Sequence, residues 1–342
     1  MSHLSNPLAT AEQLHQRALV NSLPAEIQDS IRYYTARLTQ AAGILLRLPQ
    51  DITAQANVLV YRYWLVDDLM QHEFSVRMMS HPVLCCGWIE ERRANAWQDL
   101  SAATIYMTAK VSASPRSLRS ITNVYAYLLS PSSTISVSNN TTSNPESYYV
   151  SESTYVINRN RYLHIEGQLL NALGFNVHVA LPHPLAITYL QALDVFSASH
   201  SKKNPNRGKE VGRRAIEYLN TALLSPQMLY LTHQPCSLAT AAIYLAARDI
   251  GIKLPDVGWW EVFDCEREEL GFLAVGMRSV EGLARKEQER WGVNGGMISR
   301  SDVRRELGKI GNRMGNGRSG FGEAQDEEAE MARLMDEKVG TD

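Results

Sequence analysis

The residues whose types and spacing could do chemistry form two incomplete motifs. Gly315, Gly317 and Gly320 have the G-x-G-x-x-G spacing of dinucleotide-binding turns, which need a strand before them and a helix after them. His164 and Glu166 have the H-x-E spacing of zinc deaminases. The glycines lie in a polar tail, and no P-C-x-x-C supplies thiolate ligands for zinc. The sequence therefore predicts no nucleotide cofactor, no metal and no catalytic residue.

Other ligand and nucleophile residue types are scattered. The chain has four cysteines, at Cys85, Cys86, Cys236 and Cys265. None has C-x-x-C spacing, and four are too few for a disulfide framework in a chain of this length, so a reducing compartment fits. His178 and His183 flank Pro182, where single histidines are typically hydrogen-bonded or exposed. No G-x-S-x-G elbow, P-loop or kinase signature is present, so an enzyme has little support.

Composition narrows the class of partner. The chain has 342 residues, of which 44% are hydrophobic and 20% charged, enough for one or two buried cores. Lys and Arg number 34 against 36 Asp and Glu, giving a formal net charge of −2. This balance argues against direct binding to nucleic acid or to anionic lipid. The first residues lack the pattern of a signal peptide, and no apolar run is long enough to span a bilayer, so we expect no membrane partner and a cytoplasmic or nuclear protein.

The elements that must position any site are predicted to be helices. From Ile27 the apolar residues recur at spacings of three and four, the pattern of a helix with one buried face. Strand-like alternation is rare, which predicts an all-α fold. The segment LSAATIYMTAK, ending at Lys110, aligns without gaps to LATAAIYLAAR, ending at Arg248. Each is Ala-rich and precedes a proline-containing turn, which is typical of a central helix in a bundle. Two duplicated helical domains are therefore expected.

The predicted organisation has four parts. Residues 1–24 are expected to be disordered, 25–181 to form the first domain, 182–291 the second, and 292–342 a flexible charged tail. Two insertions are predicted in the first domain, at about 78–97 and at 130–153. The first contains Cys85 and Cys86, and we interpret it either as a lineage-specific loop or as a retained intron in the translated sequence. The second is rich in Ser, Asn and Thr and has too little apolar content to fold alone.

Three stretches resemble the cyclin family, and within it most closely cyclin L. They are QAAGILLRLPQ (Gln40 to Gln50), the Ala-rich helix ending in Lys110 together with the SPRSLRSITNVYAYL that follows, and EGQLLNALGFNVHVALPHP (Glu166 to Pro184). The likeness extends from residue 25 to about residue 290. It implies two tandem cyclin boxes, each a five-helix bundle, in agreement with the internal repeat.

The resemblance also implies a function and a site. A cyclin is a regulatory subunit that binds a cyclin-dependent serine/threonine kinase and moves the C-helix of the kinase inward. In the family, a lysine ending the third helix of the first box and a glutamate on its fifth helix bind kinase backbone. These positions are Lys110 and Glu166 here, and Val111 and Leu170 are candidates for the apolar part of the contact. From the residues alone, the favoured interpretation is that Lys110 is a cation at a helix C-terminus and Glu166 a solvated residue, and Val111 and Leu170 could instead pack in the core.

Some expectations come from the cyclin L branch alone. It implies a nuclear protein whose kinase acts in RNA polymerase II transcription and pre-mRNA splicing, with splicing factors or the polymerase tail as substrates. The chain departs from the family in having no acidic stretch after Lys110 and no Arg-Ser tract after the second box. Arg248 occupies the position equivalent to Lys110, but the resemblance assigns no kinase contact to the second box. The alternative is a nucleic-acid-binding general transcription factor on the same duplicated fold, against which the net charge argues.

Overall fold

The computed structural model describes residues 4–20, 23–66, 96–130, 148–196, 206–292, 297–298 and 301–310. Residues up to Met297 belong to one compact unit, and a second unit begins at Ile298. The described residues form helices and no strand, which confirms the predicted all-α class.

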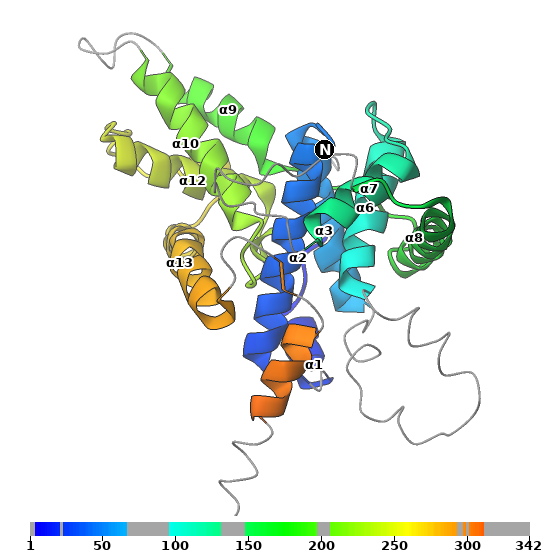
Figure 1. The fold of residues 1–342 in the computed structure, drawn as a ribbon. Coiled ribbons are helices and arrows are strands. Elements are labelled where there is room, and N and C mark those ends of the chain that lie inside the picture. Colours follow the sequence, from blue (N-terminus) through cyan, green and yellow to red (C-terminus); the bar gives the residue numbers. More distant parts are fainter. Residues whose placement is uncertain are drawn as a thin grey trace, which may run out of the picture. The chain divides into compact units, whose positions relative to one another are not determined.

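Five helices of the described residues make up the first bundle (Figure 1). They are α2 (Ala25–Leu45), α3 (Gln50–Val66), α6 (Ala96–Val111), α7 (Leu118–Leu128) and α8 (Glu152–Ala172). Helix α6 packs against all four of the others. Most of its apolar side chains are buried, Val111 at its last position being an exception, and its alanines allow neighbouring helices to approach closely. The position of α6 at the centre of the bundle agrees with the prediction made from its Ala-rich sequence.

The second bundle repeats this arrangement. It contains α9 (Pro182–Ala192), α10 (Arg207–Ala222), the short α11 (Leu229–Thr232), α12 (Pro235–Ile250) and α13 (Arg267–Trp291), with the 3₁₀ turn η4 (Glu261–Phe263) before α13. Helix α12 packs against α9, α10 and α13. It begins with Pro235 in its first turn and is capped at its C-terminus by Gly251, whose positive φ of 73° suits glycine. The two halves of the sequence repeat, α6 and α12, thus occupy equivalent central places.

Residues 4–20, part of the segment predicted to be disordered, are described by the structure and include a helix. Helix α1 spans Ala11–Val20, and Asn6 before it is buried. The Asn6 side chain donates to the carbonyl of Ala180 and accepts from the amide of the same residue, both at 2.8 Å. The Ala9 amide donates to the Leu231 carbonyl at 2.8 Å. This polar segment is held by hydrogen bonds to backbone atoms far along the chain. Amino-acid composition does not report such bonds, and it therefore gave no sign that the segment is ordered.

The other predicted irregular segments are described only in part. Most of the predicted insertion at 78–97 lies outside the described residues, but its last two positions, 96 and 97, begin α6. The insertion at 130–153 is described at 130 and from 148 onward; Ser151 caps α8 by accepting a hydrogen bond from the Thr154 amide. In the predicted tail, residues 301–310 form a helix, and residues 311–342 lie outside the described part.

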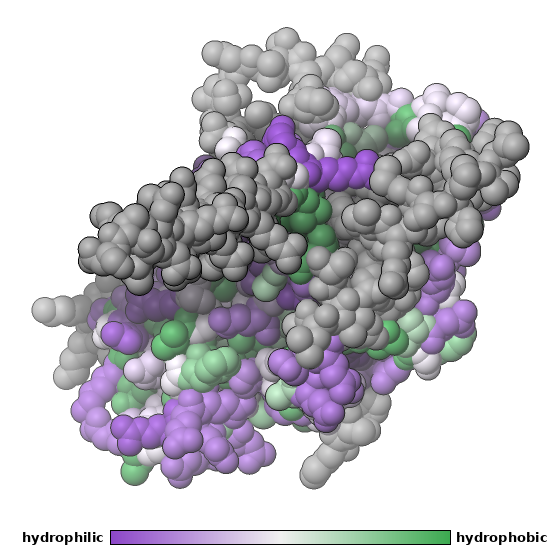
Figure 2. All heavy atoms as spheres, turned by 90° about the horizontal axis from the view of Figure 1, so that it is seen from below, coloured by the Kyte–Doolittle hydropathy of each residue, from purple (hydrophilic) through white to green (hydrophobic). Residues whose placement is uncertain are grey.

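The described surface mixes polar and apolar residues. Figure 2 shows one face, on which hydrophilic residues in purple are interspersed with hydrophobic residues in green. None of the described helices is long and apolar enough to cross a bilayer.

Candidate functional site

The structure brings together the two charged residues that the sequence singled out. The Lys110 Nζ atom lies 3.2 Å from Glu166 Oε1. Lys110 is in the last turn of α6, and Glu166 lies in the second half of α8. The Lys110 side chain is 56% exposed, whereas that of Glu166 is 9% exposed. The exposed ammonium therefore covers a carboxylate that is otherwise withdrawn from water.

Helix geometry and an aromatic ring fix the position of Lys110. A cation in the last turn of a helix is favoured by the partial negative charge of the C-terminal carbonyls. One turn earlier in α6, the ring of Tyr106 has its centroid 5.4 Å from Lys110 Nζ, a cation–π distance. Tyr106 was not among the predicted site residues, although its spacing of four from Lys110 could have indicated it.

A second, more deeply buried ion pair sets how α8 lies on α6. Arg161 of α8 donates from Nη1 to Asp99 Oδ2 at 2.9 Å, near the start of α6. Burial raises the pKa of the Asp99 carboxyl to about 6, although the charge of Arg161 opposes this rise. Asp99–Arg161 joins the first turn of α6 to α8, and Lys110–Glu166 joins its last turn to the same helix. Two ion pairs along one helix contact hold Glu166 at the end of α6.

A hydrogen-bonded chain of hydroxyl groups extends the packing of the first bundle to α2 and α7. Ser101 Oγ of α6 lies 2.6 Å from the Tyr125 hydroxyl of α7 and 2.7 Å from Thr39 Oγ1 of α2. All three residues are buried. Because each buried hydroxyl has a hydrogen-bond partner, none of the three carries the free-energy cost of an unsatisfied buried polar group.

Apolar side chains flank the ion pair on the solvent side. Val111, directly after Lys110, is 70% exposed. Leu170 is half-buried, one turn after Glu166 on α8. Nearer the start of α8, Val156 and Ile157 are also exposed. A Cβ atom built on Gly167, next to Glu166, would meet nothing within 4 Å. The four predicted site residues thus lie around one region of surface where α6 ends against α8.

The incomplete motifs take no part in a described site. His164 is exposed, and Glu166 of the H-x-E pair binds Lys110. His183 Nε2 lies 2.9 Å from Asn220 Oδ1, so this ring serves a structural hydrogen bond. Among the described residues no group of three or more His, Cys, Asp or Glu is placed to hold a metal ion. Cys236 and Cys265 are free thiols. The glycine motif at 315–320 and Cys85–Cys86 lie outside the described residues.

Comparisons with known proteins find cyclins. The chain is 29% identical to human cyclin-L1 over 254 residues, which cover 74% of this chain and 40% of the relative. It is 27% identical to mouse cyclin-L2 over 257 residues, again 74% of this chain and 40% of the relative. The match thus spans about two fifths of the length of these curated relatives. The predicted resemblance to cyclin L is confirmed. No protein-family model matches the chain.

A solved structure shares the fold. A chain of the yeast RNA polymerase II CTD kinase CTDK-1 complex superposes with a TM-score of 0.58. The superposition covers 90% of this chain and 84% of the other, at 12% sequence identity. This likeness supports the duplicated helical fold, and the residues of the site are assigned from sequence and geometry alone.

Proposed function

We propose that this chain is the regulatory cyclin subunit of a cyclin-dependent serine/threonine kinase and that Lys110, Glu166, Val111 and Leu170 form its kinase-binding site. The observation that carries the proposal is the preformed Lys110–Glu166 ion pair, beside exposed Val111, at the meeting of α6 and α8. It occupies the two positions that the resemblance to cyclins marks out.

The ion pair has hydrogen-bonding capacity to spare. A lysine ammonium has three donors and a carboxylate has two acceptor oxygens. One donor of Lys110 and one oxygen of Glu166 are used between them, so both groups can also bind peptide groups of a partner helix. Because the pair is already held in place by α6 and α8, less side-chain freedom is lost on binding.

The proposed activity is a preference for one state of the kinase. The chain contributes binding free energy to the active position of the kinase C-helix and leaves catalysis to the kinase. Once the apolar neighbours exclude water, loss of either charged partner costs about 2–5 kcal/mol of binding free energy, a factor of about 30 or more in the dissociation constant.

The test compares two double variants of the full chain with the wild type. One variant carries Lys110→Ala and Glu166→Ala. The matched control carries Glu281→Ala and Arg285→Ala, which remove an exposed ion pair of α13 with the same loss of one positive and one negative charge. Each tagged chain is expressed in the native cell and purified, bound proteins are identified by mass spectrometry, and kinase activity is assayed.

The proposal expects a cyclin-dependent kinase and its activity with the wild type and the control, and loss of both with Lys110→Ala, Glu166→Ala. Circular dichroism and thermal unfolding must show that the latter variant is folded. Equal recovery from both variants would place the interface elsewhere. Recovery of no kinase with the wild type, together with salt-sensitive binding of the full chain to DNA, would favour the general transcription factor instead.

We further propose a nuclear role for the complex, with RNA polymerase II tails or splicing factors as substrates. The support is the similarity to cyclin-L1 and cyclin-L2. The test offers the purified complex a polymerase-tail peptide and an SR-type splicing factor in parallel, and follows a tagged chain in the cell. Phosphorylation of neither substrate, or exclusion from the nucleus, would refute this role.

A further inference from the structure

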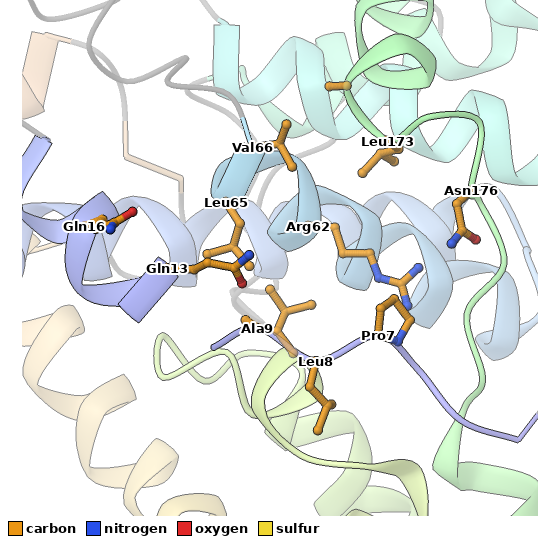
Figure 3. Close-up of a pocket in the computed structure, with 12 residues that line it drawn as sticks. Pro7, Leu8, Ala9, Gln13, Gln16, Arg62, Leu65, Val66, Leu173 and Asn176 are labelled. Carbon is orange, nitrogen blue, oxygen red and sulfur yellow. The ribbon is translucent and has the colours of Figure 1, made fainter. Parts of the chain in front are cut away.

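A pocket lies where the N-terminal segment crosses the first bundle, and none of the four residues of the proposed kinase-binding site lines it (Figure 3). Its volume is about 420 Å³, within the range of small-ligand sites. Residues before α1, the end of α3, the end of α8 and α11 all contribute to its lining. Much of the wall is apolar, including Leu8, Leu65, Leu173 and Leu231.

Arg62 of α3 is the charged residue among those that line this pocket. Figure 3 shows its side chain extending from α3 toward the N-terminal segment that carries Pro7. The residue is only 8% exposed. Burial lowers the pKa of the Arg62 guanidinium, but an arginine keeps its proton in proteins. A full positive charge is therefore enclosed in a largely apolar wall.

The partners of Arg62 within the described structure are neutral. Its Nη1 donates to the His178 carbonyl at 2.7 Å, and its Nη2 donates to Asn6 Oδ1 at 3.1 Å. Its Nε is buried without a hydrogen-bond partner. No carboxylate of the described residues forms an ion pair with it. A buried charge that lacks a counter-charge is costly, and buried polar atoms almost always have a partner.

We propose that this pocket binds a ligand with an apolar body and a single oxyanion head, a carboxylate or a phosphate, which pairs with Arg62. The apolar wall suits the body, and the guanidinium supplies charge-assisted hydrogen bonds to the head. Gln13 and Asn176 also line the pocket, and their side-chain amide nitrogens make no hydrogen bond in the described structure. Gln16 differs, because its amide donates to Glu12 on the same helix at 3.0 Å. This inference does not depend on kinase binding.

Four small probes test the ligand chemistry by calorimetric titration of the full chain. Phenyl phosphate and benzoate combine a ring with an oxyanion; benzyl alcohol has the ring without the charge, and inorganic phosphate has the charge without the ring. We expect saturable millimolar binding of phenyl phosphate or benzoate, and the stronger of the two identifies the preferred head. Benzyl alcohol and inorganic phosphate should each bind at least tenfold more weakly. Equal binding of benzyl alcohol, or binding of neither charged probe, would overturn the proposal.

Variants then place the binding at Arg62. Arg62→Met keeps the apolar stem and removes the charge, and should weaken phenyl phosphate or benzoate at least tenfold. Because Arg62 also holds Asn6, a second variant introduces a competing carboxylate at an exposed position of the wall, Leu8→Asp. The matched control is Leu4→Asp, on the same segment but outside the lining, where the side chain is 62% exposed. Tenfold weaker binding to Leu8→Asp and unchanged binding to Leu4→Asp would support the proposal.

Two results would overturn the proposal. Equal binding to wild type and Leu8→Asp would overturn the assignment to this pocket. Asp67 and Asp68 follow α3 directly in the sequence. In the second result, the probes fail to bind the wild type and yet bind a variant in which both residues are replaced by asparagine. That result would show that a carboxylate of the chain itself pairs with Arg62 in the wild type, and it would overturn the proposal of an external ligand.

Discussion

Replacing Asp99 with asparagine should change how the stability of the protein depends on pH. Asp99 is buried against Arg161 at the start of α6, and burial raises its pKa from 3.8 to about 6. Asparagine keeps an oxygen that can accept the hydrogen bond from Arg161 Nη1 but cannot titrate. A comparison of the two chains therefore isolates the proton carried by this one carboxyl group.

The sign of the effect follows from the direction of the pKa change. Since the folded chain holds this proton more tightly than the unfolded chain, the associated stability is fully present below about pH 3.8 and is lost as the pH rises through about 6. Between pH 8 and pH 5, the free energy of unfolding of the wild type should rise by about 1.4 kcal/mol relative to Asp99→Asn. This corresponds to about a tenfold change in the folding equilibrium constant.

Urea unfolding followed by tryptophan fluorescence at several pH values measures this difference, provided that the two chains share the same m value. Asp249→Asn is the control. Burial tends to raise the pKa of Asp249, but hydrogen bonds from Tyr218 and Arg214 bring it below 3.8, so its titration lies below pH 5. The difference between wild type and Asp249→Asn should stay constant from pH 8 to pH 5. Equally parallel curves for Asp99→Asn would show that Asp99 stays ionised, and would refute the reasoning.

Three further substitutions test the packing around the bundles. Tyr61→Phe removes a buried hydroxyl that donates to the Leu223 carbonyl of the second bundle at 2.9 Å. The free energy of unfolding, measured by urea titration, should fall by about 1 kcal/mol. No change would mean that this hydrogen bond adds no net stability. Gly208→Ala would place a Cβ atom 2.4 Å from the Val195 carbonyl oxygen, so α10 must shift, and thermal unfolding should show a loss of about 1–3 kcal/mol. Gly282→Ala, where nothing lies within 4 Å, should instead gain up to about 1 kcal/mol from helix propensity; equal gains at both positions would contradict the close approach.

The helical core was predictable because it rests on local patterns. Apolar spacing marked the helices, and the internal repeat marked α6 and α12 as central. The positions of Lys110 and Glu166 came from family resemblance, since residue type alone left each of them an ordinary helix residue. Their direct contact at 3.2 Å required the structure, because it depends on where α8 crosses α6.

The features that the sequence did not reveal depend on burial and on distant backbone atoms. Asp99 and Arg62 are common residue types, and their significance comes from enclosure, which has no signature of its own in one sequence. The order of the N-terminal segment depends on Asn6 and on the backbone of Ala180. Every residue has an amide and a carbonyl, so no pattern of side chains could mark Ala180 as a partner.

The attachment of the N-terminal segment has a consequence for synthesis on the ribosome. Asn6 leaves the ribosome among the first residues, yet it binds Ala180 at a separation of 174 residues and Gln234 at 228. At about 5–20 residues per second, roughly 10 to 45 s pass before Gln234 is made. During this interval the first bundle can assemble from its own helices while Arg62 still lacks the oxygen of a docked Asn6. The wall of the Arg62 pocket can therefore be completed only after Leu231 is made, as the earliest part of the chain closes over structure made long after it.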